Sequence, residues 1–321
     1  MMDVLSIIGF LLGSTLMYAT PLILVAMGAL YSEKSGIINI GLEGMMYFGA
    51  FAAAAIAYFN GNAWIALLGA GLGGAFFGLI HGFVCIKNYG NQVVSGIAIN
   101  FLAPGCALYI SMMLFDGATM TPAIPTESKI PKLFNMLFLN SGDRGLAQLL
   151  KLILNQYAIV YMAILVVAIT WIIFYKTKFG LRIRAVGEHP KAAATVGINV
   201  QKIRYIGVCI SGFLAGIGGA AYPLAIVSNF RQGLISGQGY IALAAMIFGK
   251  WRPKETLVAC LIFGFTKSLQ IFIGGPLVGW NISVDILSML PYIVTLIVLV
   301  VFVKDATSPK ALGKPYKLDS R

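Results

Sequence analysis

The stretch GIINIGLEGMMYFGA, residues 36–50, places two polar side chains, Asn39 and Glu43, inside an otherwise apolar part of the chain. Long hydrophobic runs flank the stretch on both sides. Glycines at positions 36, 41 and 44 can take backbone conformations that end a helix. The stretch therefore predicts a break between two helices, and the role of its two polar residues depends on the solvent around them.

The composition of the 321-residue chain is that of a polytopic membrane protein. Hydrophobic residues make up 59% of it and charged residues only 11%, and its mean hydropathy is +0.87, whereas a soluble domain of this length needs a charged shell. The apolar runs approach or exceed the roughly 20 residues that cross a bilayer as a helix, and they lack the alternation of barrel strands. We therefore expect an all-α transmembrane helical bundle, with residues 1–321 forming a single domain.

The apolar runs predict about nine membrane segments, within a range of eight to ten. One of them, 235–249, is short enough to be re-entrant or a half helix. The expected segments cover roughly residues 4–31, 44–60, 63–86, 92–115, 157–175, 205–227, 235–249, 256–274 and 283–303.

Basic loops predict the orientation of the chain. The net charge of +12 comes from Lys and Arg that gather between apolar runs, which fits a positive-inside bias and no nucleic-acid partner. Segment 176–204 holds seven Lys or Arg and a single acid, and the tail 304–321 is also basic. We expect both segments, and hence the C-terminus, to be cytoplasmic. Counting crossings from there places 116–156 outside as one sizeable loop.

No catalytic or metal-binding pattern stands out in the sequence. There is no phosphate-binding GxxxxGK[ST] loop, no HExxH and no GxSxG. His81 and His189 lie far apart on different elements, so we expect no metal site. The chain is expected to be a non-catalytic membrane protein without a cofactor of its own.

The basic segment contains a short predicted helix in GEHPKAAATVG. Pro190 suits a first helical position, Ala192 to Ala194 favour helix, and Gly197 can supply a left-handed stop. A helix of about two turns is too short to be stable alone, so we expect it to pack against another surface. The alternative is an ordinary surface helix, and these residues alone do not decide between the two.

Several motifs resemble those of one transporter family. In chain order they are SGIINIGLEGMM, VVSGIAINFLAPG, FGLRIRAVGEHPKAAATVGINV, SGQGYIALAAMIFGKWRP and ALGKPY. The resemblance as a whole runs from about Leu22 to Tyr316. Together they are similar to ABC importer permeases of the branched-chain amino acid, ribose and nucleoside group. Within that group, the short N-terminus and the NIGLEG and ALGKPY motifs most resemble the shorter of two permeases in nucleoside importers that a lipoprotein supplies.

The resemblance implies a set of partners and a coupling site. A paralogous second permease would share the path as a heterodimer, a cytoplasmic ABC ATPase would bind ATP-Mg, and an external binding lipoprotein would deliver the solute. The complex would lie in the cytoplasmic membrane of a bacterium. A simple sugar or a branched-chain amino acid is the alternative solute. The resemblance assigns ATPase coupling to Glu188, His189, Pro190, Lys191, Ala192, Ala193 and Gly197.

Polar residues within or beside the spans are candidates for the translocation path. Two interpretations of Glu43 stay open: a position on the path, or a cytoplasmic turn in which Glu43 is solvated at the N-terminus of the next helix. Asn100 can bind solute or join two helices, and Lys267 either faces a cavity or pairs with an acid. The full set of candidates is Asn39, Glu43, Asn100, Ser236, Gln238, Tyr240 and Lys267.

Two other classes of protein compete with an ABC permease. An ion-coupled secondary transporter predicts a dedicated intramembrane charge pair, for which Lys267 and Asp285 are weak candidates; Asp285 otherwise caps the last helix. A membrane enzyme acting on a lipid-linked substrate predicts convergent catalytic groups at one interface, and the sequence offers none.

Overall fold

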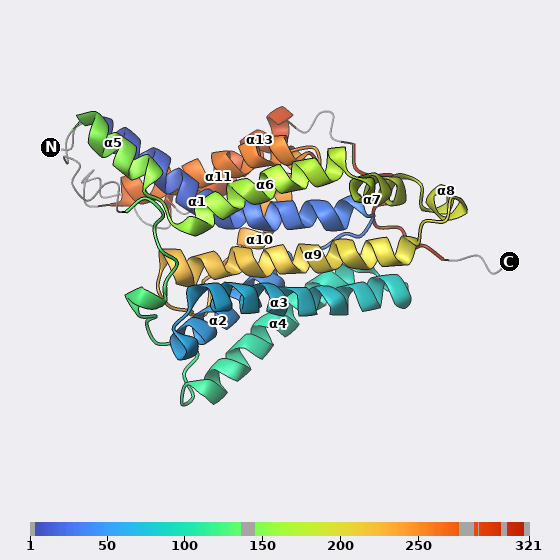
Figure 1. Cartoon of the computed structure of the whole chain (residues 1–321), viewed down its shortest axis with the longest axis horizontal. Coiled ribbons are helices and arrows are strands. Elements are labelled where there is room, and N and C mark those ends of the chain that lie inside the picture. Colours follow the sequence, from blue (N-terminus) through green and yellow to red (C-terminus); the bar gives the residue numbers. More distant parts are fainter. Residues whose placement is uncertain (1–3, 136–144, 276–285, 288, 303–306, 318–321) are drawn as a thin grey trace.

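The computed structural model describes residues 4–135, 145–275, 286–287, 289–302 and 307–317. Within these ranges the chain is a helical bundle with no named β-strand. Helices α1, α6, α9 and α11 run along the long axis of the molecule, and α4 leaves the bundle at an angle (Figure 1). The N-terminus and α5 lie at one end of the bundle, and α7, α8 and the C-terminus lie at the other (Figure 1).

Seven helical spans among the described residues are long and apolar enough to cross a membrane. Helix α3 continues into the π-helical turn η1 (Phe83–Lys87), and α9 continues into the π-helical turn η4 (Tyr222–Ile226). The seven helices are α1 (Val4–Lys34), α2 (Leu42–Asn60), α3 (Ala63–Gly82), α4 (Gln92–Leu114), α6 (Ala158–Lys176), α9 (Val200–Ala221) and α11 (Pro253–Gly274).

The remaining two expected spans have a different outcome. The segment expected at 235–249 forms α10 (Gln238–Phe248), an 11-residue helix that is too short to span alone. The segment expected at 283–303 is described only in part, as α13 (Leu290–Phe302), and Asp285 lies outside the described residues. The all-helical class is confirmed, while a total of nine spans stays a prediction.

The segment 116–156, expected as a loop, contains a helix of its own. Helix α5 (Gly145–Leu154) packs on the first half of α1, where Ser6 donates to Gln148 at 2.9 Å. Before α5, the chain forms the 3-10 turn η2 (Thr126–Ser128) and pairs with the backbone after α9, since Ile124 N donates to Ser228 O at 2.7 Å. This segment is therefore fastened to the bundle at two places.

Several helices begin where a side chain can replace a missing backbone partner. The oxygen of Asn62 accepts from Trp64 N, that of Asn91 accepts from Val93 N, and that of Asn199 accepts from Lys202 N, each at 2.9 Å. Asparagine at such a position satisfies amides that the helix itself leaves free. These caps fix the first residues of α3, α4 and α9.

The rigid centre of the bundle is the crossing of α3 and α9. A Cβ atom at Gly74 would lie 2.1 Å from Gly212 O, and one at Gly212 would lie 2.4 Å from Gly74 O. Only glycine allows this approach, which confirms that the small residues spaced four apart mark a close helix contact. The span that begins with α9 is 78% buried. The remaining spans pack around this centre.

Candidate translocation site

The backbone between α1 and α2 is not helical, and it lies inside the bundle. Ser35, Ile37 and Asn39 are fully buried. Asn39 contacts Ser211, which lies roughly 16 Å along α9 from its first residue at 1.5 Å per residue. Residues 35–41, which we call the interrupted segment, therefore reach well into the depth of the spans. Such backbone is tolerated in a membrane where protein buries it.

Side chains of α3 and α4 replace the hydrogen bonds that the interrupted segment lacks. Ile38 N donates to Gln92 Oε1 at 2.7 Å, and Ile38 O lies 2.9 Å from His81 Nε2. The other ring nitrogen of His81 lies 3.0 Å from Ser95 Oγ. Since Ile38 O accepts, His81 donates from Nε2. His81 and Gln92 thus bind both backbone polar groups of one residue, Ile38.

Asn39 supports the interrupted segment from α9. Its side-chain amide donates to Ser211 Oγ at 2.9 Å, while its Oδ1 has no hydrogen-bond partner among the residues that the structure describes. Because Asn39 is 0% exposed, it lies in the packing between helices, and its predicted place on the path stays a prediction.

Glu43 combines parts of both interpretations that the sequence left open. It lies in the first turn of α2, but its carboxylate accepts from Gly237 N at 2.7 Å and from Gly239 N at 2.6 Å. Those amides form the N-terminus of α10, where an anion is favoured by free N–H groups and by the helix dipole. Glu43 is thus bound by a second broken element of the bundle, and the solvated turn is not observed.

Asn100 joins three elements around the same break. Its Oδ1 accepts from Gly44 N at 2.8 Å, and its Nδ2 donates to Ile40 O at 3.0 Å and to Tyr240 OH at 2.8 Å. Asn100 therefore links α4, the start of α2 and α10, and its predicted contact with solute stays a prediction. Tyr240 is still 46% exposed, so the cluster reaches the surface of this chain.

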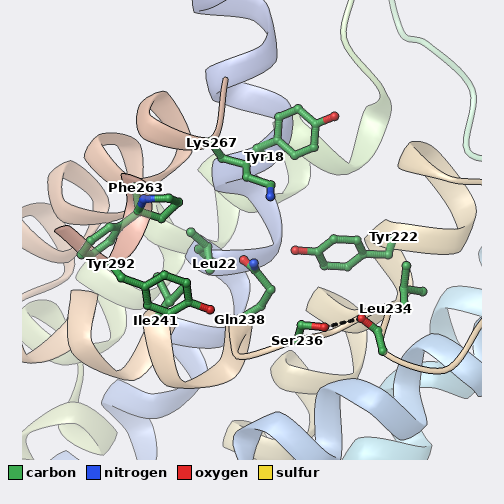
Figure 2. A pocket seen from close by; sticks show the side chains of 12 residues that line it. Tyr18, Leu22, Tyr222, Leu234, Ser236, Gln238, Ile241, Phe263, Lys267 and Tyr292 are labelled. Carbon is green, nitrogen blue, oxygen red and sulfur yellow. Dashed lines mark hydrogen bonds between the residues drawn. The ribbon is translucent and has the colours of Figure 1, made fainter. Parts of the chain in front are cut away.

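A cavity of about 310 Å³ opens beside this cluster (Figure 2). Figure 2 shows the ends of Lys267 and Gln238 and the hydroxyl of Tyr222 pointing into the same space. Three predicted residues line it, namely Ser236, Gln238 and Lys267. The other lining residues are Tyr18, Leu22, Tyr222, Gly233, Leu234, Ile241, Phe263, Pro291 and Tyr292.

The Lys267 side chain faces the cavity. Its ammonium donates to Gln270 Oε1 at 2.9 Å, and across the part of the chain that the structure describes no carboxylate lies within salt-bridge distance. Ser236 donates to Gly233 O. The cavity therefore offers a cation, an amide and hydroxyls among aromatic rings, a combination that suits a small polar solute with a planar ring.

The seven predicted path residues thus form two neighbouring groups with one left over. Glu43, Asn100 and Tyr240 form the cluster at the break, and Ser236, Gln238 and Lys267 face the cavity. The loop before α10 joins the two groups, and Asn39 lies apart from both. Within the described ranges, no group of His, Cys, Asp or Glu could hold a metal ion.

Sequence reasoning missed the aromatic lining and the residues that hold the interrupted segment. Tyr18, Tyr222 and Tyr292 are spread over three elements, and aromatic residues are common throughout the chain, so no local pattern singled them out. His81 did carry a signal. A histidine within a glycine-rich apolar span needs a hydrogen-bond partner.

The short helix predicted in the basic segment is present as α8 (Pro190–Thr195). It follows α7 (Lys178–Glu188), begins with Pro190 and ends before Gly197, which has the left-handed φ of +83°. Ala193 is buried and Pro190 is half-buried. The other residues predicted to contact an ATPase are exposed, namely Glu188, His189, Lys191, Ala192 and Gly197.

Comparisons with known proteins agree over nearly the whole chain. The family model described as branched-chain amino acid transport system / permease component matches residues 11–301. The guanosine ABC transporter permease protein NupQ of Bacillus subtilis (strain 168) is 45% identical over 98% of both chains. The nucleoside ABC transporter permease protein NupC of Lactococcus lactis subsp. cremoris (strain MG1363) is 36% identical over 98% of this chain and 99% of its own. A putative glucose ABC transporter permease protein, TsgC13 of Haloferax volcanii, is 33% identical over 90% of both chains.

B. subtilis and L. lactis each hold a second, more distant relative. The guanosine ABC transporter permease protein NupP of B. subtilis is 28% identical over 79% of this chain, and the nucleoside ABC transporter permease protein NupB of L. lactis is 25% identical over 94%. These relatives are permease subunits, which are non-catalytic membrane components. The match over residues 11–301 and the full-length relatives show that this multi-pass membrane chain belongs to the branched-chain amino acid transport system / permease component family of ABC transporters.

Proposed function

We propose that this chain is one of two permeases in an ATP-driven importer of nucleosides. The observation that carries the solute class is the cavity beside the interrupted segment, with its aromatic walls, its amide and its lysine (Figure 2). The relatives at 45% and 36% identity are named for guanosine and for nucleosides, which supports the same class.

The chemistry of the cavity fits the parts of a nucleoside. The rings of Tyr222, Phe263 and Tyr292 offer faces and edges to a planar base, while Gln238 and Ser236 offer donors and acceptors to ribose hydroxyls. The volume of about 310 Å³ is at the small end of the ~300–1,000 Å³ that ligand pockets usually have. The Lys267 ammonium would donate to acceptors on the base edge.

A second permease would complete the path. Tyr240 is 46% exposed, although it belongs to a polar cluster within the depth of the spans. Polar side chains at that depth face protein or water and not lipid. Helix α4, which carries Asn100, is the least buried of the seven spans, at 28%. We infer that a paralogue of this chain covers this side, as a heterodimer, and that lipid covers the rest of the apolar surface.

Helix α8 would be the element that an ATPase holds. Lys191 of α8 is exposed, as are Glu188 and His189 directly before it, at the end of the molecule that also carries the basic C-terminal tail (Figure 1). We place this end in the cytoplasm by the positive-inside rule. ATP-Mg would bind to the partner ATPase, and an external binding lipoprotein would dock at the opposite end, where α5 lies (Figure 1).

An ion-coupled transporter working alone is less well supported. It predicts an intramembrane acid paired with a base. Among the described residues, the buried Glu33 and the half-buried Glu43 are bound otherwise, because Glu33 accepts from Trp251 Nε1 at 2.6 Å and Glu43 accepts from the N-terminus of α10. Lys267 has no acid partner within those residues.

The proposal is tested by purifying a tagged copy of the chain from native membranes and measuring ATP hydrolysis in proteoliposomes. Nucleosides, glucose and branched-chain amino acids are compared in the presence of the external binding protein. We expect a stoichiometric ATPase and second permease, with stimulation by nucleosides. Stimulation by glucose alone would show that the solute is a sugar, the class for which the Haloferax relative is named. Transport by the chain alone, driven by an ion gradient, would contradict the proposal.

In the same preparation, Glu188→Ala combined with Lys191→Glu tests the role of α8. We expect reduced nucleoside-stimulated ATP hydrolysis in a bundle that stays folded, because the exposed contact charges are removed or reversed. Unchanged stimulation would exclude α8 as the coupling element. Lys178→Glu, an exposed cation at the other end of α7, is the control.

A further inference from the structure

Residues 307–317, which we call the C-terminal strap, cross the end of the bundle where α7 and α8 lie (Figure 1). The strap has no helix of its own, yet Pro309 and Ala311 are buried. Its backbone is bound to three parts of the chain that are distant in sequence. An extended tail with buried side chains and specific backbone bonds is a built element of the fold.

The first contact joins the strap to the corner before α8. Ala311 N donates to Gly187 O at 2.9 Å. Gly187 lies in the last turn of α7, directly before the residues that lead into Pro190. There is no room for a side chain at Gly187, because a Cβ atom would lie 2.1 Å from Lys34 O. The end of α1, the end of α7 and the strap therefore meet at this glycine.

The second contact joins the strap to the interrupted segment. Gly313 N donates to Gly36 O at 3.2 Å. Gly36 has a φ of +93°, which disfavours any other residue, and a Cβ atom there would lie 2.9 Å from Arg204 Nη2. The first peptide units of the interrupted segment are thus held by the tail of the chain.

The third contact is a buried arginine that binds both elements at once. Arg204, in the first turns of α9, is 1% exposed. Its Nε donates to Ser35 O and its Nη1 donates to Lys314 O, both at 3.2 Å. Among the described residues, no carboxylate pairs with it and its Nη2 has no hydrogen-bond partner. The guanidinium is a planar fork with donors on several sides, so it can hold two carbonyls in fixed relation, which a lysine cannot do as well.

We propose that Arg204 and the C-terminal strap form a junction that transmits movement of the α7–α8 corner to the interrupted segment. Arg204 is a positioning residue in this junction. The amides of Ser35, Gly36 and Ile37 donate to carbonyls in the last turn of α1. The position of the interrupted segment is otherwise set by its anchors, which are the strap and Arg204 at one end and, further along, the side chains of His81, Gln92, Ser211 and Asn100. A shift of Gly187 would move the strap, hence Gly36, and hence the start of α2 with Glu43.

This inference rests on the proposed function, because it assumes that an ATPase moves α8. It also adds to that function. The junction gives a route by which a displacement at the surface could reach polar groups deep in the bundle without bending a whole helix. Chains of packed groups and hydrogen bonds carry coupling between distant sites when both sites bias the same element.

The first test uses the intact complex in proteoliposomes and compares Arg204→Met, Arg204→Lys and a chain that ends at residue 306. The readout is the number of solute molecules transported per ATP hydrolysed. Arg204→Met and the shortened chain should lower this ratio about five-fold or more, the lower end of ordinary coupling between sites, while ATP hydrolysis continues. Arg204→Lys keeps the charge but loses the planar guanidinium, so its ratio should lie between that of these two variants and that of the unchanged chain.

Two matched controls accompany these variants. Lys202→Met removes a neighbouring exposed cation of α9, and Lys314→Ala removes a side chain of the strap while keeping the carbonyl that Arg204 binds. Both should leave the ratio unchanged. An unchanged ratio in Arg204→Met and in the shortened chain would overturn the proposal. This includes the case in which ATP hydrolysis and transport both fall in equal proportion, because the ratio is then unchanged and the complex has lost assembly instead of coupling.

The second test needs no variant and therefore does not depend on folding. Hydrogen exchange of the amides of 35–41 and 186–189 is followed in the wild-type complex with and without ATP. The junction predicts that both segments change protection together. A change at 186–189 with none at 35–41 would overturn it. If the wild-type complex shows no ATP-driven transport of nucleosides, the proposed function fails, but the joint change in exchange still decides whether the junction exists.

Discussion

The crossing of α3 with α9 and the interrupted segment hold their backbones in opposite ways. At the crossing, both helices keep their own hydrogen bonds and touch through Gly74 and Gly212, with no room for a methyl group. In the interrupted segment, side chains such as His81 and Gln92 replace the helical bonds. The first arrangement tolerates no displacement without a clash, because packed interiors are close to solid. The second can shift when its anchors shift, and it is where the polar groups gather.

The largest effect is expected from filling the rigid crossing. Gly212→Val should lower the free energy of unfolding by about 3 kcal/mol or more, because its side chain would overlap Gly74 O. Thermal unfolding in detergent measures this loss. Gly105→Ala is the control, because a Cβ atom there meets nothing within 4 Å in α4, and it should be neutral or stabilise by about 0.5 kcal/mol. Equal effects of the two changes would contradict the assignment of the crossing as the rigid part.

The next effect is expected at the N-terminus of α10. Glu43→Ala leaves the amides of Gly237 and Gly239 without their acceptor, which should cost about 2 kcal/mol locally. We expect faster hydrogen exchange at 237–240 and a strong loss of transport. Glu255→Ala removes an exposed acid at the start of α11 and should change neither. If Glu43→Ala behaved like Glu255→Ala, the carboxylate would not be holding α10.

A smaller effect is expected from Asn100. Asn100→Leu removes three hydrogen bonds between α4, the start of α2 and Tyr240, but leaves the helices themselves intact. The half-saturating concentration of nucleoside should rise by about ten-fold, equivalent to about 1.4 kcal/mol. Phe101→Leu, at the adjacent exposed position, serves as the control. An unchanged concentration dependence would leave Asn100 with a purely structural role.

The smallest effect is expected in the cavity. Lys267→Met should weaken nucleoside uptake about five-fold, because a charged donor to the solute is lost while water can replace part of it. Lys267→Arg should retain most of the uptake. Lys254→Met changes a lysine on the same helix that lies over Trp171, outside the cavity, and should have no effect. Uptake that became sensitive to an ion gradient in Lys267→Met would instead point to ion coupling.

Much of the helical framework was predictable from the sequence, since apolar length alone marks spans. The glycine spacing in α3 and α9 predicted a close contact, and Pro190 and Gly197 marked the ends of α8. Helix α5 was missed because its segment was assigned by charge and by parity, and ten residues fall below the length of a span.

The candidate site was predictable only in part. Intramembrane polar residues such as Glu43 and Lys267 stand out in an apolar sequence, because each is costly in lipid. Their partners do not stand out. Nothing local in the sequence shows that Glu43 binds α10, nearly two hundred residues later, or that Arg204 binds the strap. Such contacts depend on which helices become neighbours, and spacing along the chain does not carry that information.

The central claim is that solute binding changes the interrupted segment and the loop before α10 and leaves the crossing of α3 with α9 unchanged. Hydrogen exchange of the reconstituted complex with and without nucleoside tests it most directly. We expect added protection at 233–240 and 37–41 and no change at 208–219. Protection that is confined to 208–219, or that leaves 233–240 unchanged, would contradict the account.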